Sequence, residues 1–344
     1  MSQPGLILTV NAGSSSLKVA GYRGAEQVYR HTAERLPAGG IGAALQACLT
    51  DLADTPPSAV GHRIVHGGGR FTAPVLGSPA VLGELEALTP LAPLHQPHNL
   101  AAVRAVGEAL PGVPQVLCFD TAFHATMPRV EQLFALPRGY ADRGVRRYGF
   151  HGLAYESVVE QLGDRAAGRV LACHLGNGAS LCGIRDGRSV ATTMSFTPLD
   201  GLVMGTRPGH LDPGVVLYLQ RHEGMSLDAV DRLLEHESGL LGASGGLSAD
   251  MRDLLASDSA EAAEAVELFC HRAVREAGAM AAVLGGVDAV AFSGGIGENA
   301  APVRDRICRR LGWLGVGAGV PVHVVPADEA AVIARHTRAV LATA

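Results

Sequence analysis

The chain contains 344 residues, of which 47% are hydrophobic and 18% are charged, and its formal net charge is −5. This length allows two domains with separate cores, and the composition is typical of a soluble globular protein. The slightly negative charge argues against nucleic acid or an anionic membrane as a partner, and no apolar run reaches the roughly 18 residues of a membrane span. The N-terminus lacks the basic segment of a signal peptide, so we expect a cytoplasmic protein. The six cysteines form no CxxC pair, which favours buried core thiols over a metal site or disulfides.

The first predicted element is a β-hairpin over residues 6 to 22, with the turn Asn11-Ala12-Gly13-Ser14-Ser15-Ser16. Glycine and small hydroxyls at such a turn allow backbone amides to approach phosphate oxygens closely. Lys18 follows the turn and is the only lysine in the chain. It is either a phosphate contact or an ordinary exposed strand residue, and the sequence does not separate the two. A helix is predicted next, over residues 41 to 52.

The segment AVGHRIVHGGGRF, residues 59 to 71, is predicted to contain a buried strand that delivers His62, Arg63 and His66 into a run of three glycines, and Arg63 has mostly apolar neighbours. Because a buried charge must be paired or meet a ligand, Arg63 either binds an anion, which the glycines favour, or belongs to a structural ion pair. Residues 80 to 110 are predicted as two helices around a loop that prolines make rigid. The next strand, residues 115 to 119, ends on Asp120, where open α/β sheets place their chemistry; the alternative is that Asp120 caps the following turn.

Three further glycine-rich segments follow. The turn Gly149-Phe150-His151-Gly152 is predicted to put His151 at the start of a helix, where an anion can bind. A strand over residues 170 to 173 breaks at Gly176-Asn177-Gly178 and resumes over residues 179 to 184, ahead of an Asp186-Gly187 hairpin turn. A strand over residues 287 to 293 leads into another glycine-rich turn, residues 294 to 297. Three strand-to-glycine-turn segments predict a nucleotide cradle built from two similar halves.

Three helices complete the prediction. The first lies in the segment that begins at Gly224 and is closed by Gly239. Residues 259 to 284 show the period of an amphipathic helix. The chain ends with a strand and a terminal helix whose first turn contains Asp328 and Glu329, where acidic side chains interact favourably with the helix dipole.

Taken together, these segments resemble the acetate kinase family. The shared motifs run in the family's order over nearly the whole chain: NAGSSSLK, GHRIVHGG, LAPLHQP, FDTAFHATMP, RRYGFHG, CHLGNGAS, FTPLDGLVMGTR, SADMRD, GIGEN and VVPADEAAVIAR. The resemblance implies an α/β fold of two duplicated ribonuclease H-like domains, of the actin/Hsp70/sugar-kinase type, with a nucleotide cleft between them. It implies an N-terminal domain of residues 1–119 plus 331–344, with the first phosphate turn and the acyl-substrate arginine. Residues 120–330 would form a C-terminal domain with the second phosphate turn, the adenosine site and a homodimer interface.

The reaction implied by the resemblance is reversible phosphoryl transfer from ATP to the carboxylate of acetate, giving acetyl phosphate and ADP, with Mg²⁺ or Mn²⁺. The implied catalytic residues are Asp120, His151, Arg207 and Arg63. The implied acyl-substrate contacts are Arg63, Val65, Leu94, Phe150 and Pro198. The implied nucleotide contacts are Ser14, Ser16, Lys18, His174, Asn177, Gly178, Asp250, Met251, Arg252, Gly295, Gly297 and Asn299. The implied metal-site residues are Asn11 and Glu329.

Phosphoryl transfer to a carboxylate is consistent with such a set. The carboxylate is already a nucleophile, so it needs in-line positioning and positive charge near the phosphoryl oxygens, and no strong general base. The chain has neither a GxxxxGK[ST] motif nor a protein-kinase catalytic loop. Propionate is the alternative acyl substrate, because one methylene in an apolar pocket is worth only about 1–3 kcal/mol. A nucleotide-binding regulator of the same fold is the more distant alternative.

The chain departs from the family pattern beside two of these residues. After His151 and Gly152 it has Leu153-Ala154-Tyr155, where many members have Thr-Ser-His. After Arg207 it has Pro208-Gly209-His210, where Ser/Cys-Gly-Asp is common. The chain is also shorter than usual within residues 24 to 58 and between residues 313 and 322. We therefore expect altered hydrogen bonds around His151 and Arg207, while the residues that meet substrate are kept.

Overall fold

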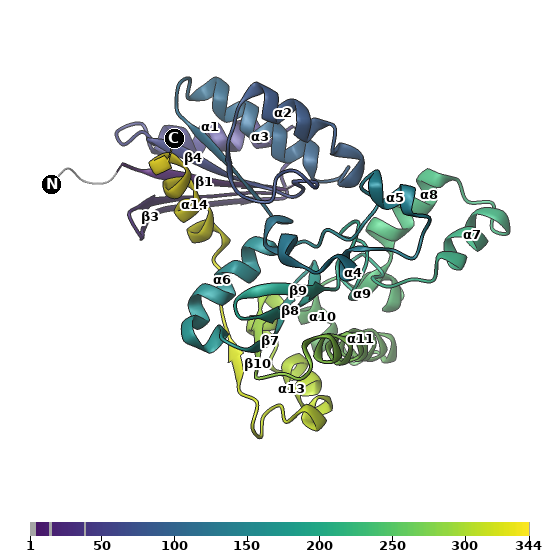
Figure 1. Ribbon diagram of the computed structural model, residues 1–344. Coiled ribbons are helices and arrows are strands. Elements are labelled where there is room, and N and C mark those ends of the chain that lie inside the picture. The colour runs from purple at the N-terminus through teal and green to yellow at the C-terminus, as the bar shows by residue number, and fades with distance from the viewer. Residues whose placement is uncertain (1–4, 14–15, 38, 344) are drawn as a thin grey trace. The chain divides into compact units, whose positions relative to one another are not determined.

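In the computed structural model, which describes residues 5–13, 16–37 and 39–343, the chain divides into two compact units (Figure 1). Met1–Ala125 and Asp328–Ala344 belong to the first unit, and Thr126–Ala327 form the second. Asp120 and Glu329 therefore belong to the first unit, whereas the boundaries expected from the sequence place both in the second domain. The division into functional domains stays a prediction.

The first unit is built on a six-stranded sheet with the order β3-β2-β1-β4-β6-β5. Its strands are β1 (Ile7–Ala12), β2 (Ser16–Arg23), β3 (Glu26–Glu34), β4 (Ala59–Ile64), β5 (Val75–Leu76) and β6 (Gln115–Phe119). The first three strands pair antiparallel, and β4 and β6 continue from β1 in parallel. The helices are α1 (Ile41–Asp51), α2 (Pro79–Glu86), η1 (Thr89–Leu91), α3 (Gln96–Ala109) and α14 (Glu329–Thr343), with η2 (Ala122–Thr126) at the junction of the units.

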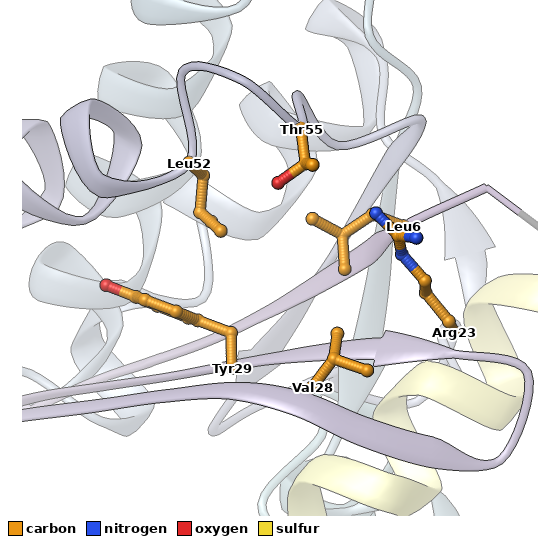
Figure 2. A pocket seen from close by; sticks show the side chains of 6 residues that line it. All are labelled: Leu6, Arg23, Val28, Tyr29, Leu52 and Thr55. Carbon is orange, nitrogen blue, oxygen red and sulfur yellow. The ribbon is translucent and has the colours of Figure 1, made fainter.

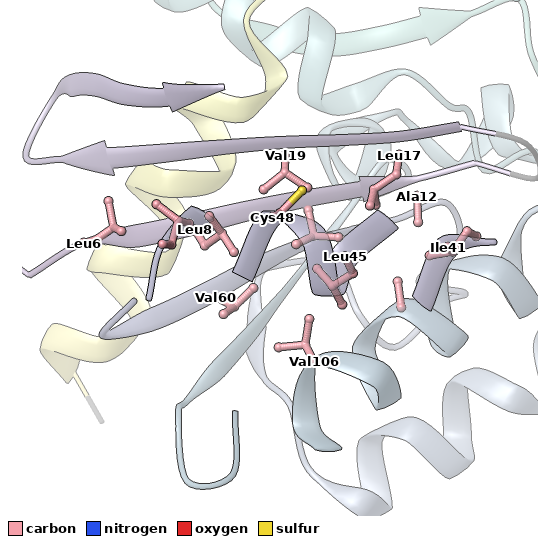
Figure 3. Close-up of a cluster of buried hydrophobic side chains, with 13 residues drawn as sticks. Leu6, Leu8, Ala12, Leu17, Val19, Ile41, Leu45, Cys48, Val60 and Val106 are labelled. Carbon is pink, nitrogen blue, oxygen red and sulfur yellow. The ribbon is translucent and has the colours of Figure 1, made fainter. Parts of the chain in front are cut away.

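Side chains alternate between the two faces of this sheet, as the pleat of a strand requires. Leu8 and Val10 of β1 point to one face, where they form a buried core with α1 and α3 (Figure 3). Ile7 points to the other face and packs with Ala334 of α14. By the same alternation, Asn11 on β1 and Arg63 on β4 share the α14 face. Two polar side chains are thereby placed on one face, at the carboxyl ends of neighbouring parallel strands.

Helix α14 lies unusually close to the sheet at Gly61 on β4. A Cβ at residue 61 would lie 2.3 Å from Thr337 Oγ1 and 2.5 Å from Ile333 Cγ2. The helix can approach this closely only because glycine has no side chain. As a result, the first residue of α14, Glu329, comes within hydrogen-bonding distance of Asn11.

The second unit repeats the strand order of the first. Its sheet has the order β11-β10-β7-β8-β9. The strands are β7 (Arg169–Leu175), β8 (Ala179–Arg185), β9 (Arg188–Thr192), β10 (Ala289–Ser293) and β11 (Val322–Val324). The first three again pair antiparallel, and β10 and β11 continue from β7 in parallel. This repeat confirms the predicted fold of two duplicated α/β halves.

Helices surround the second sheet. Helix α11 packs against β7, β8 and β9, and α6 packs against β7 and β10. The helices are α4 (Arg129–Gln132), α5 (Arg138–Asp142), α6 (Gly152–Leu162), η3 (Gly163–Ala166), α7 (Pro213–Arg221), α8 (Leu227–Arg232), η4 (Leu233–Glu237), α9 (Gly239–Ala243), α10 (Met251–Ala256), α11 (Ala260–Leu284), α12 (Gly294–Asn299), α13 (Ala301–Arg310) and η5 (Gly312–Leu314). The single tryptophan of the chain, Trp313, lies in η5 and is largely exposed. Within the described ranges, no helix is both long and apolar enough to cross a membrane.

Most predicted elements are present, and three differences have a physical reason. The glycines at 294 to 297 form the short helix α12 directly after β10, so the third predicted turn is wrong. The helix expected to be closed by Gly239 is interrupted by a π-helical turn, η4, and Gly239, with φ of 62°, begins α9. Strand β3 was not predicted, because its largely exposed side chains show no apolar alternation.

Figure 2 shows a hollow in the first unit between the β2–β3 hairpin and the end of α1. It is lined by Leu6, Arg23, Val28, Tyr29, Leu52 and Thr55. Because Leu6 precedes β1 and Asn11 lies near its end, this hollow is at the opposite end of β1 from the polar residues described next.

Candidate functional site

Arg63, at the carboxyl end of β4, is the centre of a polar cluster in the first unit. Its Nε donates to Asp120 Oδ1 at 3.1 Å, and its Nη2 donates to the second oxygen of the same carboxylate. Its Nη1 donates to Asn11 Oδ1 at 3.2 Å. The Asp120 carboxylate is only 1% exposed. A two-point contact between guanidinium and carboxylate fixes both groups in orientation.

Glu329 closes this cluster from α14. Its Oε2 accepts a hydrogen bond from Asn11 Nδ2 at 3.2 Å and lies 3.7 Å from Arg63 Nε. Burial raises the pKa of Asp120, and Arg63 offsets part of this rise. Burial by itself would lower the pKa of Arg63, but Asp120 and Glu329 raise it above its usual value, so Arg63 stays charged. The ion pair that the sequence left as an alternative for Arg63 is therefore present, and it consists of residues expected to act on substrate.

Asn99 on α3 joins two parts of this cluster and was missed from the sequence. Its Oδ1 accepts from the backbone N–H of Val65 at 2.9 Å, and its Nδ2 donates to the carbonyl of Ala12 at 2.6 Å. The side chain thus ties Val65, directly after β4, to the last residue of β1. Its position could have been noticed, because Asn99 continues the core-facing stripe of α3 that includes Val103 and Val106. A polar side chain on such a stripe needs a buried partner.

A second cluster forms in the second unit around Gly178, in the turn between β7 and β8. A Cβ at residue 178 would lie 3.1 Å from Arg207 Nη2 and 3.3 Å from His151 Nε2. The two side chains therefore converge on the space that the glycine leaves open. An imidazole nitrogen and a guanidinium nitrogen at one point form a site suited to an anion.

His151 reaches this point from a strained backbone. It is the N-cap of α6 with φ of 60° and ψ of 24°, a left-handed conformation that is uncommon for residues other than glycine. Its Nδ1 lies 2.9 Å from Ser180 Oγ, and Ser180 Oγ lies 2.5 Å from the hydroxyl of Tyr155. Its ring centroid is 4.7 Å from that of His174, whose Nδ1 lies 3.0 Å from Ser293 Oγ. Strain of this kind is typical of functional sites.

Arg207 lies in the loop between β9 and α7 and is held by another residue of that loop. Its Nη1 donates to the carbonyl of Pro198 at 2.8 Å. Burial lowers its pKa, and the Glu235 carboxylate acts in the opposite direction. A Cβ on Gly239 would lie 2.7 Å from the Arg207 carbonyl, so the positive φ of this glycine permits the close approach of the two segments.

Asn177 is positioned by another glycine. The backbone N–H of Gly205 donates to the Asn177 carbonyl at 2.9 Å, and a Cβ on Gly205 would come within 1.9 Å of Asn177 Oδ1. The Asn177 side chain therefore lies directly over the Gly205 backbone, beside Gly178. Expected nucleotide contacts thus gather around this turn.

The other expected nucleotide contacts lie in three places. Ser16 and Lys18 are on β2; Lys18 is exposed and pairs across the sheet with Asn11, whereas Ser14 lies outside the described residues. Asp250 caps α10 and pairs with Arg252, while Met251 is buried. Gly295, Gly297 and Asn299 lie in α12, where Asn299 Nδ2 donates to the Gly295 carbonyl.

The expected acyl-substrate contacts divide between the units. Val65 is buried and Leu94 half-buried in the first unit. Phe150 and Pro198 are buried in the second unit. Phe150 precedes His151 in the chain, and the carbonyl of Pro198 accepts a hydrogen bond from Arg207.

The oxygen atoms of the first cluster are compatible with a hard divalent cation. No group of three His, Cys, Asp or Glu side chains with metal-site geometry occurs among the described residues. Mg²⁺ does not require one, because it keeps several waters and is usually held by one or two carboxylates together with substrate phosphates. Arg63 with Asp120 and Glu329 carries one positive and two negative charges, and this net charge of −1 fits a cation.

The two units together define a class of protein. Each contains the strand order of the actin/Hsp70/sugar-kinase fold, and each places a polar cluster at the end of its central strands. The sequence model of the Acetokinase family matches residues 41–342, and the chain belongs to that family.

Individual relatives agree with this assignment. The chain is 52% identical over 309 residues to an acetate kinase of Methylocella silvestris, covering 84% of this chain and 76% of the relative. It is similar to the crystal structure of Porphyromonas gingivalis acetate kinase, with a TM-score of 0.86 and 34% identity over 98% of this chain and 100% of that chain. It is also similar to a propionate kinase from Francisella tularensis, with a TM-score of 0.90 and 32% identity over 97% and 99% of the two chains.

Proposed function

We propose that the protein catalyses reversible, Mg²⁺-dependent transfer of the γ-phosphoryl group of ATP to the carboxylate of acetate, giving acetyl phosphate and ADP in one in-line step. The observation that carries this proposal is the convergence of His151 Nε2 and Arg207 Nη2 beside Gly178, in a chain of the Acetokinase family. Binding of a nucleotide by a regulator does not by itself require these two groups together with Arg63 and Asp120. Both clusters serve one reaction in this proposal.

The second cluster stabilises the transferring phosphoryl group. As the phosphoryl moves, its equatorial oxygens carry the charge, and pre-positioned N–H donors lower the barrier most effectively. His151 and Arg207 would donate to these oxygens, and Gly178 would leave room for them. His174 on β7 and Asn177 in the turn that follows would contact the phosphates of the nucleotide.

The first cluster orients the acyl group and supports the cation. Arg63 would bind the carboxylate or the incoming phosphoryl, and Asp120 would hold the guanidinium in orientation. Asn11 and Glu329 would hold Mg²⁺ through its waters, and the cation would neutralise phosphate charge when bound. No strong base is assigned, because an acetate carboxylate attacks without losing a proton.

The remaining contacts set the specificity. Val65, Leu94, Phe150 and Pro198 would surround the methyl group, and Asp250, Met251 and Arg252 would lie against the adenosine. Propionate is the second candidate substrate, supported by the similarity to a solved propionate kinase. An extra methylene changes discrimination by only about 1–3 kcal/mol, so the two acids are tested together.

A hydroxamate assay tests this function. Purified protein is incubated with MgATP and hydroxylamine in the presence of acetate, propionate or butyrate, since hydroxylamine traps any acyl phosphate as a coloured product. We expect the highest kcat/KM with acetate and no product after Mg²⁺ is removed with EDTA. No product with any acid, while ATP still binds, contradicts the kinase proposal and favours the nucleotide-binding alternative.

A single substitution tests the site. Arg207→Ala removes one donor to the phosphoryl group and should reduce kcat by roughly 10³-fold or more, in line with arginines in other phosphoryl transfers. Its melting temperature should fall only slightly, because the variant loses one hydrogen bond to the Pro198 carbonyl and the attraction of the half-buried Glu235 carboxylate. Arg165→Ala is the control, since Arg165 is exposed and, among the residues that the structure describes, donates only to nearby backbone carbonyls. A large loss of stability in Arg207→Ala with full activity retained would support a structural role instead.

We further infer a homodimer in the cytoplasm. Family membership supports this inference, and size-exclusion chromatography with light scattering tests the dimer.

A further inference from the structure

Tyr155 lies where this chain departs from the common Thr-Ser-His pattern of its family, and it is fully buried on α6. Its hydroxyl lies 2.5 Å from Ser180 Oγ, and Ser180 Oγ lies 2.9 Å from His151 Nδ1. Ser180 is also fully buried. Three polar side chains from α6, β8 and the turn before α6 therefore form a chain of hydrogen bonds that ends on a residue of the second cluster.

The direction of these bonds can be worked out from donors and acceptors. Burial raises the pKa of Tyr155, so the phenol keeps its proton. The backbone of His174 acts to lower the pKa of Tyr155, which is the effect of an amide N–H that donates to the phenol oxygen. A phenol oxygen that accepts from the amide has its own proton left for Ser180 Oγ, 2.5 Å away, and this is the direction that we assign to the bond.

The next bond then follows. A serine hydroxyl has one proton, and Ser180 Oγ already accepts from Tyr155. Its proton is therefore available for His151 Nδ1, 2.9 Å away. If Nδ1 of a neutral imidazole accepts, the proton of the ring is on Nε2. Nε2 is the nitrogen that converges with Arg207 Nη2 beside Gly178.

We propose that Tyr155, acting through Ser180, is a positioning residue that holds His151 in the Nε2–H tautomer, so that an N–H and not a lone pair faces the phosphoryl group. This inference rests on the proposed function for its catalytic meaning, but the tautomer itself is a property of the free protein. Many family members have a histidine, which is titratable, at the position of Tyr155. The tyrosine of this chain can instead donate to Ser180 at every physiological pH.

Histidine NMR tests the relay directly. The protein is labelled with ¹⁵N-histidine, and two-bond ¹H–¹⁵N spectra distinguish the Nδ1–H, Nε2–H and doubly protonated rings. The His151 signals are identified among the 14 histidines by their absence from His151→Gln. We expect the Nε2–H tautomer in the native protein and a mixture of tautomers in Tyr155→Phe and Ser180→Ala. A native Nδ1–H tautomer, or an Nε2–H tautomer unchanged in both variants, overturns the proposal.

Kinetics provide the second readout. Each variant should lower kcat about 10-fold and leave KM for acetate unchanged, because loss of one oriented hydrogen bond is worth roughly that factor. The double variant should be no slower than either single variant, since both break the same chain of bonds. Tyr148→Phe is the control, because it also removes a buried hydroxyl, which bonds to the Gly144 carbonyl in the same unit. It should match Tyr155→Phe in melting temperature and keep the native tautomer and kcat.

The two proposals fail differently. If the protein forms no acyl phosphate but His151 shows the expected tautomers, the proposed reaction is wrong and the relay stands. If the protein is active and kcat falls equally in Tyr148→Phe and Tyr155→Phe, the effect of Tyr155 is structural and the relay is wrong.

Discussion

The pair of Arg63 and Asp120 predicts a large and local loss of stability when only one partner is removed. In Arg63→Met the Asp120 carboxylate, 1% exposed, loses both of its hydrogen-bond donors on Arg63 and is left near Glu329. Breaking a buried ion pair in this way costs roughly 3–5 kcal/mol. We therefore expect the first unit of Arg63→Met to open about two to four orders of magnitude more often than that of the native protein.

Buried cysteines allow this opening to be measured separately in each unit. Cys48 and Cys118 are fully buried in the first unit, and Cys118 pairs with Arg63 across the sheet. Cys182 is fully buried in the second unit. Thiol labelling under native conditions, followed by mass spectrometry of the peptides, gives the opening rate at each cysteine. In Arg63→Met, labelling of Cys48 and Cys118 should accelerate strongly while that of Cys182 is unchanged.

The pH dependence has a definite sign. Without Arg63, burial holds the pKa of Asp120 above its unfolded value, so the folded protein binds a proton that the unfolded chain releases. Stability of the variant should therefore fall as the pH rises through this interval, and the loss should be larger at pH 8 than at pH 5.5. The double variant Arg63→Met/Asp120→Leu should recover much of the loss, because no unpaired charge remains. Less than a 10-fold change in Cys118 labelling at pH 8 would refute this reasoning.

Three further predictions follow from single positions. His62 is fully buried, and burial lowers its pKa to about 4, so the free energy of unfolding should fall by up to about 3 kcal/mol as the pH drops from 6.5 to 4. The rate of Cys118 labelling should rise accordingly over this pH range, and this pH dependence should be absent in His62→Leu. Gly61→Ala should destabilise the first unit by about 2–4 kcal/mol, measured by thermal unfolding, because its Cβ would clash with α14. Gly83→Ala is the control, since the space around Gly83 is open. An unchanged stability in Gly61→Ala would contradict the close packing of α14. Gly205→Ala should displace the Asn177 side chain and lower kcat/KM for ATP about 10-fold, with little loss of stability. Unchanged kinetics would show that Asn177 does not contact the nucleotide.

Much of this architecture can be predicted from the sequence, because local patterns determine it. The turn at Gly176 to Gly178 follows the apolar strand β7, and strand β6 ends at Phe119, directly before Asp120, as the pattern predicts. Tertiary contacts between distant segments are harder to predict. The contact of Glu329 with Asn11 depends on the close packing of α14 at Gly61, and no local pattern reveals that distance.

The surroundings of the site show the same limit. Tyr155 is visible in the sequence as a departure from the family, but its bond to Ser180 depends on how α6 packs on β7 and β10. Glycines near 294 favour a turn by composition, yet the chain continues as a helix. Composition gives the residues available to a segment, and packing selects among the conformations that they allow.

The chain has a single lysine in the first unit and a single tryptophan in the second, so each unit carries one residue that spectroscopy can observe separately. Lys18, the only lysine, is exposed on β2 in the first unit, and Trp313, the only tryptophan, is largely exposed in the second. An amine-reactive fluorophore can therefore modify only Lys18 and the α-amino group, and indole emission has a single source. Energy transfer from Trp313 to a label on Lys18 would follow the separation of the two units as acyl substrate is added, without any engineered residue.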